Sequence, residues 1–360
     1  MPGFLTASLA PRIRHDFAFG DSALGLSIAL FYVVSAVGSI PAGRLVDRLG
    51  AGRGTALVAC TTGACCVGVA LLAHSAAGLA ALLLLGGVGN ALGSPTVSTL
   101  LKREVAGRKH GLAFGAQQSG ASLGALLAGL ALPAVAIPFG WRWAYVGAAV
   151  LTVVACAAAP RWEAVAAATP RGRRTSGLTS VHALGLAAVL ASAAGVGFVS
   201  FLVSYSVDHG LSDAEAGLLL GGVSLMATLS RIGLGVHADR ASQEPLRPVT
   251  AMLAASVIGY LLLITGTPGI VVAAALFTGA LGWAWPGGLN LAVVQRCPDA
   301  PAWAVGVLMT GLFTGAVIGP LIVGLLAEHD LFAEAWGTCA TFALLAAATL
   351  AATRRAESRV

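Results

Sequence analysis

Long apolar runs separated by short polar breaks make up this chain. A helix needs about 20 apolar residues to cross the hydrocarbon core of a bilayer. The core offers no water to backbone groups, and the alternation typical of barrel strands is absent, so the runs are predicted to be helices. Eleven membrane-spanning helices are expected, at residues 23–45, 54–73, 77–101, 111–136, 142–160, 181–206, 213–237, 248–266, 269–295, 302–327 and 335–353.

A shorter apolar run occupies residues 1–10. As a helix rising about 1.5 Å per residue it would span about 15 Å, half of a core about 30 Å thick. We therefore expect part of a first helix, beginning in mid-membrane. A basic leader with a small-residue cleavage site is absent, so a removed signal peptide explains the run less well than a start codon placed too late or a true truncation.

The longest polar gap, residues 161–180, contains Pro170 and a cluster of three arginines. It divides the spans into two sets and is the natural linker between them. We predict an N-terminal bundle at 1–160 (a partial helix 1 and helices 2–6), a cytoplasmic linker at 161–180, and a C-terminal bundle at 181–360 (helices 7–12).

The two sets carry related strings. GRLVDRLG begins at Gly43, and GVHADR begins 192 positions later at Gly235. Small residues repeat as well: at an offset of 191, Gly115, Ser119, Gly120 and Gly124 match Gly306, Thr310, Gly311 and Gly315. This repetition indicates two halves derived by duplication. The small residues are expected to let packed helices slide or rock, without touching a ligand.

Composition agrees with a membrane protein and changes the interpretation of the charge. With 57% hydrophobic and 10% charged residues and a mean hydropathy of +0.87, the chain is too apolar for a soluble domain. The net charge of +6 indicates orientation, not nucleic-acid binding, because basic residues fall in the breaks between spans. Seventeen Lys and Arg residues lie on the GRLVDRLG side and three on the other. That side, and the C-terminus, are predicted to be cytoplasmic.

Polar side chains inside the spans are few, so their positions are informative. We expect them to face a cavity between the halves and to include the substrate-binding residues; the candidates are Asn90, Gln117, Gln118, Arg231, Trp285 and Asn290. Trp285 and Asn290 belong to a stretch with Pro286 that forms either a kinked aromatic wall or plain packing.

Arg231 is the strongest single candidate, because it is expected to lie deep in the membrane. It precedes Asp239, at the end of its span, by eight positions, or about 12 Å along a helix. A charge at that depth must be paired or hydrated. One hypothesis is an anchor for an anionic group of the substrate, since guanidinium matches carboxylate. The other is a structural arginine that binds backbone carbonyls or the region near Asp239.

A carboxylate follows each of the repeated glycines by four positions. The Gly at a helix foot lets a neighbouring backbone approach, and the carboxylate can face the positive N-terminus of another helix. The alternative is that both strings only form tight loops and add to the charge bias. The expected pairs are Asp47 with the start of 302–327 and with Arg103 or Lys102, and Asp239 with the start of 111–136 and with Arg296.

These strings resemble a signature of the major facilitator superfamily, the G-x-x-x-D-R pattern between the second and third helices. The matching residues are Gly43, Asp47, Arg48, Gly50 and Arg53, and in the second copy Gly235, Asp239 and Arg240. The family's fuller form has adjacent basic residues after the second Gly, where this chain has Ala51 and Gly52. The resemblance implies an all-α polytopic membrane protein of two pseudo-symmetric six-helix bundles, and a latch that closes the cytoplasmic side while the outside is open.

The function expected from these features is that of a secondary active or facilitative transporter that moves a small solute by alternating access. The strings AFGAQQSG and GWRWAYV resemble those of bacterial transporters of small anions, so a small organic anion is a candidate substrate. The alternatives are a non-transporting sensor or receptor, and an inactive truncated relative.

Several other classes of function are not supported by the sequence. The spans carry no cluster with catalytic or metal-ligand spacing, so an enzyme, a catalytic residue, a metal site or a cofactor is not expected. No G-x-x-x-x-G-K-[ST] loop indicates ATP. All fifteen acidic residues lie in loops or at span ends, so no visible span carries a carboxylate that could relay a proton at mid-membrane. Facilitated diffusion, anion exchange and coupling through the missing part of the first helix remain as alternatives. The expected partners are the lipid bilayer of the inner cell membrane and the solute, with the chain as a monomer.

Overall fold

The computed structural model describes residues 1–17, 20–104, 110–158, 178–240, 244–297 and 301–357. These residues form an all-α fold, as the hydrophobic pattern predicts. The first half contains α1 (Pro2–Ser8), α2 (Ala10–Phe17), α3 (Asp21–Leu72), α4 (Ala76–Glu104), α5 (His110–Ala131), a π-helical turn (Leu132–Ala136), α6 (Ile137–Phe139) and α7 (Trp141–Ala158). The second half contains α8 (Leu178–Asp208), α9 (Asp213–Arg240), α10 (Leu246–Leu263), α11 (Pro268–Gly282), α12 (Pro286–Arg296), α13 (Pro301–Ala327) and α14 (Phe332–Glu357).

All eleven expected spans are confirmed in the described residues, where eleven helical segments are long and apolar enough to cross a membrane. The predicted linker at 161–180 lies outside the described residues except for its last three positions. Helix α3 holds two spans, 21–39 and 52–72. The helical path continues through GRLVDRL and turns at Gly50, whose φ of 80° is in the left-handed region that glycine adopts without strain.

One expected span is broken in the middle. Residues 283–285 separate α11 from α12, and Pro286 is the first residue of α12. Proline has no backbone N–H and cannot donate to the preceding turn, so the helix stops before it and carbonyl groups are left available. The sequence leaves a kinked wall and plain packing open for this stretch, and the helix here is broken completely.

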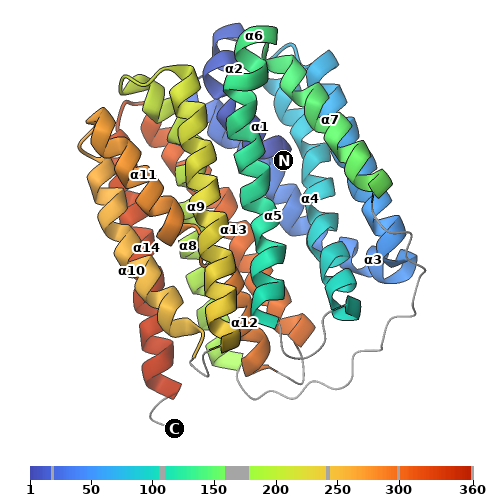
Figure 1. The fold of residues 1–360 in the computed structure, drawn as a ribbon, viewed down its shortest axis with the longest axis vertical. Helices are drawn as coiled ribbons and strands as arrows, with labels where there is room; N and C mark the ends of the chain where they lie inside the picture. Colours follow the sequence, from blue (N-terminus) through green and yellow to red (C-terminus); the bar gives the residue numbers. More distant parts are fainter. Residues whose placement is uncertain (18–19, 105–109, 159–177, 241–243, 298–300, 358–360) are drawn as a thin grey trace.

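The helices run side by side along the long axis of the molecule (Figure 1). The turn within α3, the start of α5, the end of α9 and the C-terminus lie at one end, which we call the motif end. The opposite end carries α2 and α6 and is called the α2 end. The short helix α1 starts at mid-height and packs against α3, α5 and α8.

Two seams join the halves of the chain. Helix α5 packs against α9, and α3 packs against α13. Outward-facing leucines such as Leu123, Leu127 and Leu130 are exposed on α5, as expected for a helix in lipid, where apolar side chains lose nothing by facing outward. The helices of each seam therefore expose one face to lipid and turn another toward the opposite half.

Candidate functional site

Arg231 lies within α9 and is only 2% exposed. Its Nε and one terminal nitrogen donate to the Trp283 carbonyl, at 3.1 and 2.5 Å. That carbonyl is available because the helix is broken between α11 and α12. The guanidinium carbon also lies 5.1 Å from the centre of the Trp283 ring, within the range of a cation–π contact. The break between α11 and α12 thus supplies both a hydrogen-bond acceptor and an aromatic face for the buried charge.

The other terminal nitrogen of Arg231 reaches across to the first half. It donates to the Gln118 carbonyl and, at 3.0 Å, to the Ser122 hydroxyl, both on α5. Four of the five guanidinium N–H groups are therefore used in this structure. This is the arrangement of a structural arginine that binds backbone carbonyls, and it joins α5, α9 and the α11–α12 break at one point.

The α5–α9 seam around Arg231 depends on glycines that permit close backbone contact. A Cβ at Gly115 would lie 2.7 Å from the Arg231 carbonyl oxygen, and a Cβ at Gly129 would lie 2.6 Å from the Gly217 carbonyl oxygen. These separations are too short for any larger residue without displacement of a helix. Gly120 has open space around it and is exposed, so it does not belong to this seam.

Asp239, at the end of α9, accepts a hydrogen bond of 2.9 Å from the backbone N–H of Leu112. Leu112 is the third residue of α5, where backbone N–H groups have no partner within the helix. The carboxylate therefore sits at the positive end of the α5 dipole. This contact crosses between the halves at the motif end, where the sequence places it.

The first copy of the motif is described only in part. Gly50 forms the turn in α3, Gly43 has open space at its Cβ position, and Arg48 and Arg53 are exposed. Arg240, in the second copy, is exposed, whereas Gly235 is buried in the α5–α9 seam. The side chains of Asp47 and Arg103 lie outside the described residues, so their pairing stays a prediction.

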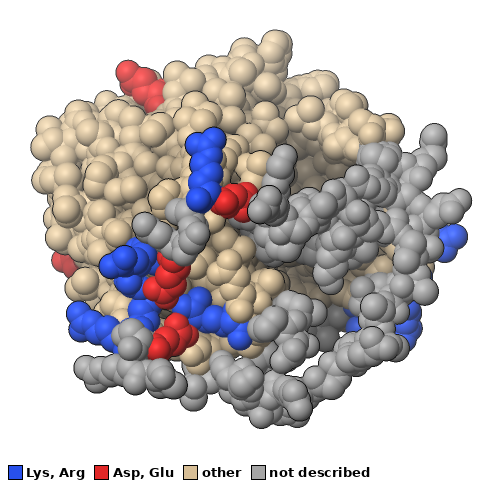
Figure 2. Space-filling model, turned by 60° about the horizontal axis from the view of Figure 1, so that its bottom comes forward, with Lys and Arg blue, Asp and Glu red and all other residues tan. Residues whose placement is uncertain are grey.

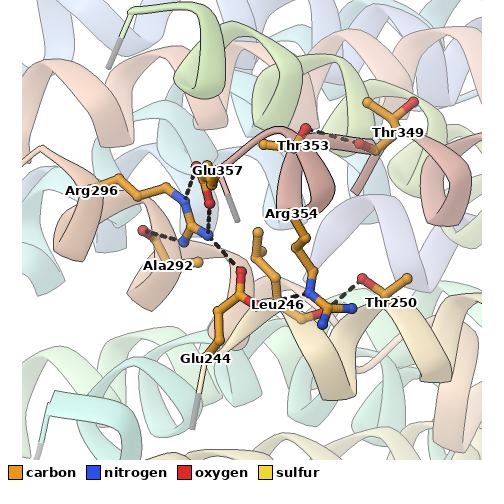
Figure 3. Close-up of polar contacts among 9 residues, drawn as sticks. All are labelled: Glu244, Leu246, Thr250, Ala292, Arg296, Thr349, Thr353, Arg354 and Glu357. Carbon is orange, nitrogen blue, oxygen red and sulfur yellow. Dashed lines mark hydrogen bonds and ion pairs between the residues drawn. The ribbon is translucent and has the colours of Figure 1, made fainter. Parts of the chain in front are cut away.

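Arg296 makes its contacts with two carboxylates, Glu244 and Glu357 (Figure 3). The nitrogen-to-oxygen distances are 2.9 Å to Glu244 and 2.8 and 2.9 Å to Glu357. Glu244 also accepts from Arg354 at 2.8 Å. The sequence predicts that Arg296 pairs with Asp239. In the structure Arg296 lies at the end of α12 beside α14, while Asp239 faces α5.

This network ties the ends of α12 and α14 to the start of α10 within the second half. Basic and acidic side chains are interleaved on the face seen from the motif end (Figure 2). Sequence reasoning missed Glu244 and Glu357. A usable signal was present, since each lies within four residues of an Arg in a polar break at the end of a span.

Three of the remaining candidates, Asn90, Asn290 and Trp285, contact residues of their own half of the chain. The Asn90 amide on α4 donates to the Ser35 hydroxyl on α3 at 3.0 Å. The Asn290 amide donates to the Pro286 carbonyl at 3.0 Å and is 3% exposed. Trp285 is packed in the apolar core of the second half, as in the plain-packing alternative. Gln117 and Gln118 are half-buried on α5, and Gln118 reaches the Arg231 site through its backbone carbonyl.

The α2 end is held closed by contacts that sequence reasoning missed. Arg12 on α2 pairs with Asp213 at the start of α9, with 2.7 Å between Nε and Oδ2. Glu328, just after α13, accepts the Ser22 backbone N–H of α3 at 3.0 Å. This hydrogen bond holds the pKa of the Glu328 carboxyl below its ordinary value. Both contacts cross between the halves, one beside each seam.

Comparison with known proteins agrees with this architecture. The sequence matches the family model of the Major Facilitator Superfamily over residues 1–302. The fold is similar to the crystal structure of a bacterial homolog of the human lysosomal transporter Spinster, in its inward-facing and occupied conformation, with a TM-score of 0.72 and 16% identity over 98% of this chain and 93% of that one. The inward-facing and unoccupied conformation gives a TM-score of 0.69 and 17% identity over 98% and 94%.

No curated protein matches the sequence. At 16–17% identity, the likeness to the solved structures establishes the fold alone. The family match covers most of the chain and coincides with the two-half architecture, the paired motif strings and the eleven spans. The chain therefore belongs to the major facilitator superfamily of membrane transporters.

Proposed function

We propose that this chain moves a small solute across the inner cell membrane by alternating access, with the bundles at 1–160 and 181–360 as its two moving parts. The motif end and the C-terminus face the cytoplasm in this proposal, since most Lys and Arg residues lie in the breaks on that side. In this orientation the contacts at the α2 end close the outer side of the molecule.

The observation that carries the proposal is the closure of the α2 end by contacts that can be broken. The side chains of Arg12 and Asp213 are 42% and 23% exposed. Ion pairs with such exposure contribute about 0–1 kcal/mol, so they can be lost and regained in each cycle. A static fold gains little from placing pairs of this kind between its two halves, whereas a gate requires them.

At the motif end the two seams differ. The α5–α9 seam is in contact through Asp239 and the start of α5. On α13, by contrast, Thr310 and Thr314 are exposed and Gly306 has open space at its Cβ position. This row of small and polar positions is suited to line a path that opens toward the motif end.

A small organic anion is the proposed substrate class. Arg231 is the one cation buried at mid-span among the described residues. In the present state its N–H groups are taken by Trp283 and α5. A carboxylate would bind Arg231 by replacing the Gln118 carbonyl and the Ser122 hydroxyl, which would also loosen the contact between the halves. Substrate binding and movement of the halves would thus be coupled through one side chain.

The gate is tested by cross-linking. Cysteines at Arg12→Cys and Asp213→Cys, placed in a background without the six native cysteines, should form a disulfide that stops uptake into proteoliposomes. Reduction should restore the uptake, and each single-cysteine variant should remain active. Full uptake with the disulfide intact would contradict the proposal.

Substrate class is tested with labelled carboxylates of increasing size, each paired with its amide, with and without a proton gradient. Saturable uptake of a carboxylate but not of its amide supports an anion substrate. Saturable binding without any flux would instead favour a receptor or an inactive relative.

A further inference from the structure

A cavity opens at the α2 end between α2 and α8, away from the Arg231 site. Its volume is about 360 Å³, and it is lined by Pro11, Arg14, His15, Ser204, Val207 and Asp208. The volume is at the lower end of the range for small-molecule sites, about 300–1,000 Å³. The two halves of the chain each provide one wall, and the Arg12–Asp213 gate contact starts from the same helix α2.

The charge of the cavity favours a cation. The one arginine in its wall, Arg14, is neutralised by Asp21, with 2.6 Å between Nη1 and Oδ1. Asp208 has no ion-pair partner in the described residues; the charged groups that act on it electrostatically are Arg14, His209 and Asp330. Arg14 already pairs with Asp21 and Asp330 adds a further negative charge, so the Asp208 carboxylate has no ion pair of its own in the described residues.

Ser204 provides an independent indication of a ligand. Its side chain is 2% exposed, yet its hydroxyl has no hydrogen-bond partner among the described residues. Buried hydroxyls on α9, such as those of Ser224 and Thr228, instead donate to the carbonyl four residues earlier. A buried hydroxyl without a partner in the wall of a cavity is available to bind whatever enters it.

We propose that this cavity binds a small alkylammonium compound. Its ammonium group would donate to the Asp208 carboxylate and the Ser204 hydroxyl, and its carbon chain would contact Pro11 and Val207. Divalent metal ions are less suitable, because Ca²⁺ takes about six to eight oxygen ligands and the described wall offers few. The cavity opens to the surface at the α2 end, so an occupant would enter it from the side opposite the motif end. It is separate from the anion site proposed at Arg231.

The test measures binding to the purified full chain in lipid nanodiscs by calorimetry. Propylammonium is the probe, and propionate, propionamide, sodium and potassium ions are the comparison solutes. Asp208→Asn should weaken propylammonium binding at least about tenfold, the loss expected for a hydrogen bond to a charged group. Ser204→Ala should weaken it about threefold to fivefold. Glu334→Gln, an exposed carboxylate at the start of α14, is the matched control and should leave the affinity unchanged.

The proposal would be overturned if the wild type did not bind propylammonium, if wild type and Asp208→Asn bound it equally, or if sodium or potassium ions gave the same Asp208-dependent heat. Binding of propionate through Arg14 would also oppose it. Melting temperatures of all variants show whether each one is folded. Because the assay measures binding and not flux, its outcome is independent of the transport proposed above.

Discussion

Replacement of Arg231 by Met tests the contact that joins the two halves at mid-membrane. The change keeps much of the side-chain volume and removes four hydrogen bonds to Trp283, Gln118 and Ser122. Hydrogen bonds between membrane helices average about 0.6 kcal/mol, and bonds to charged groups contribute about 1.5 kcal/mol or more. Four such bonds therefore give a loss of about 2–6 kcal/mol.

The assay is thermal unfolding of the purified protein in detergent. A loss of 2 kcal/mol corresponds to a fall in melting temperature of about 4–8 °C if the unfolding unit is one bundle of about 150–250 residues. Arg231→Lys keeps the charge but has a compact ammonium that cannot match the fork of the guanidinium, so an intermediate fall is expected. Arg247→Met is the control, because Arg247 is exposed at the start of α10 and lies outside the motif strings.

Transport kinetics then separate the two roles of Arg231. If Arg231 only bridges the two halves and does not contact the substrate, Arg231→Lys should be less stable but should keep the wild-type KM for carboxylates. An anion anchor predicts a KM raised at least about tenfold. A melting temperature of Arg231→Met within about 1 °C of the wild type would refute the bridging role derived from the structure.

Three further predictions concern the gates. Gly115→Ala should slow transport and destabilise the protein by about 1–3 kcal/mol because the α5–α9 seam has no room for a methyl group, whereas Gly120→Ala should be neutral in the same flux and unfolding assays. Asp239→Asn should weaken the capping of α5 by about 0.3–1 kcal/mol, seen as faster hydrogen exchange in its first turn; unchanged exchange would contradict the contact. The bond between Glu328 and the start of α3 lowers the pKa of Glu328, so its contribution is present above the ordinary pKa of 4.5 and is lost as the pH falls through the lower folded value. The labelling rate of a cysteine introduced at the α2 end should therefore rise in acid. The rate should be high at every pH in Glu328→Gln, whereas in Glu334→Gln it should have the pH dependence of the wild type.

The sequence determined the features that depend on one segment at a time. Eleven runs of sufficient length and apolarity were enough to predict the eleven spans, because the cost of an unpaired backbone in lipid leaves a helix as the solution for each run. The paired strings predicted two related halves, and the carboxylate of Asp239 was placed in advance at the start of α5. A kink beside Pro286 was one of the two alternatives that the sequence left open, since proline acts on its own turn.

Only the tertiary structure decided which residues meet. A residue's direction changes by 100° from one position to the next along a helix, so sequence spacing alone does not say which neighbour a side chain faces. This is why Arg231 binds carbonyls on α5 and at the α11–α12 break, and why Arg296 binds Glu244 and Glu357. The pairing of Arg12 with Asp213 depends on the docking of two helices 201 positions apart, which no local pattern encodes.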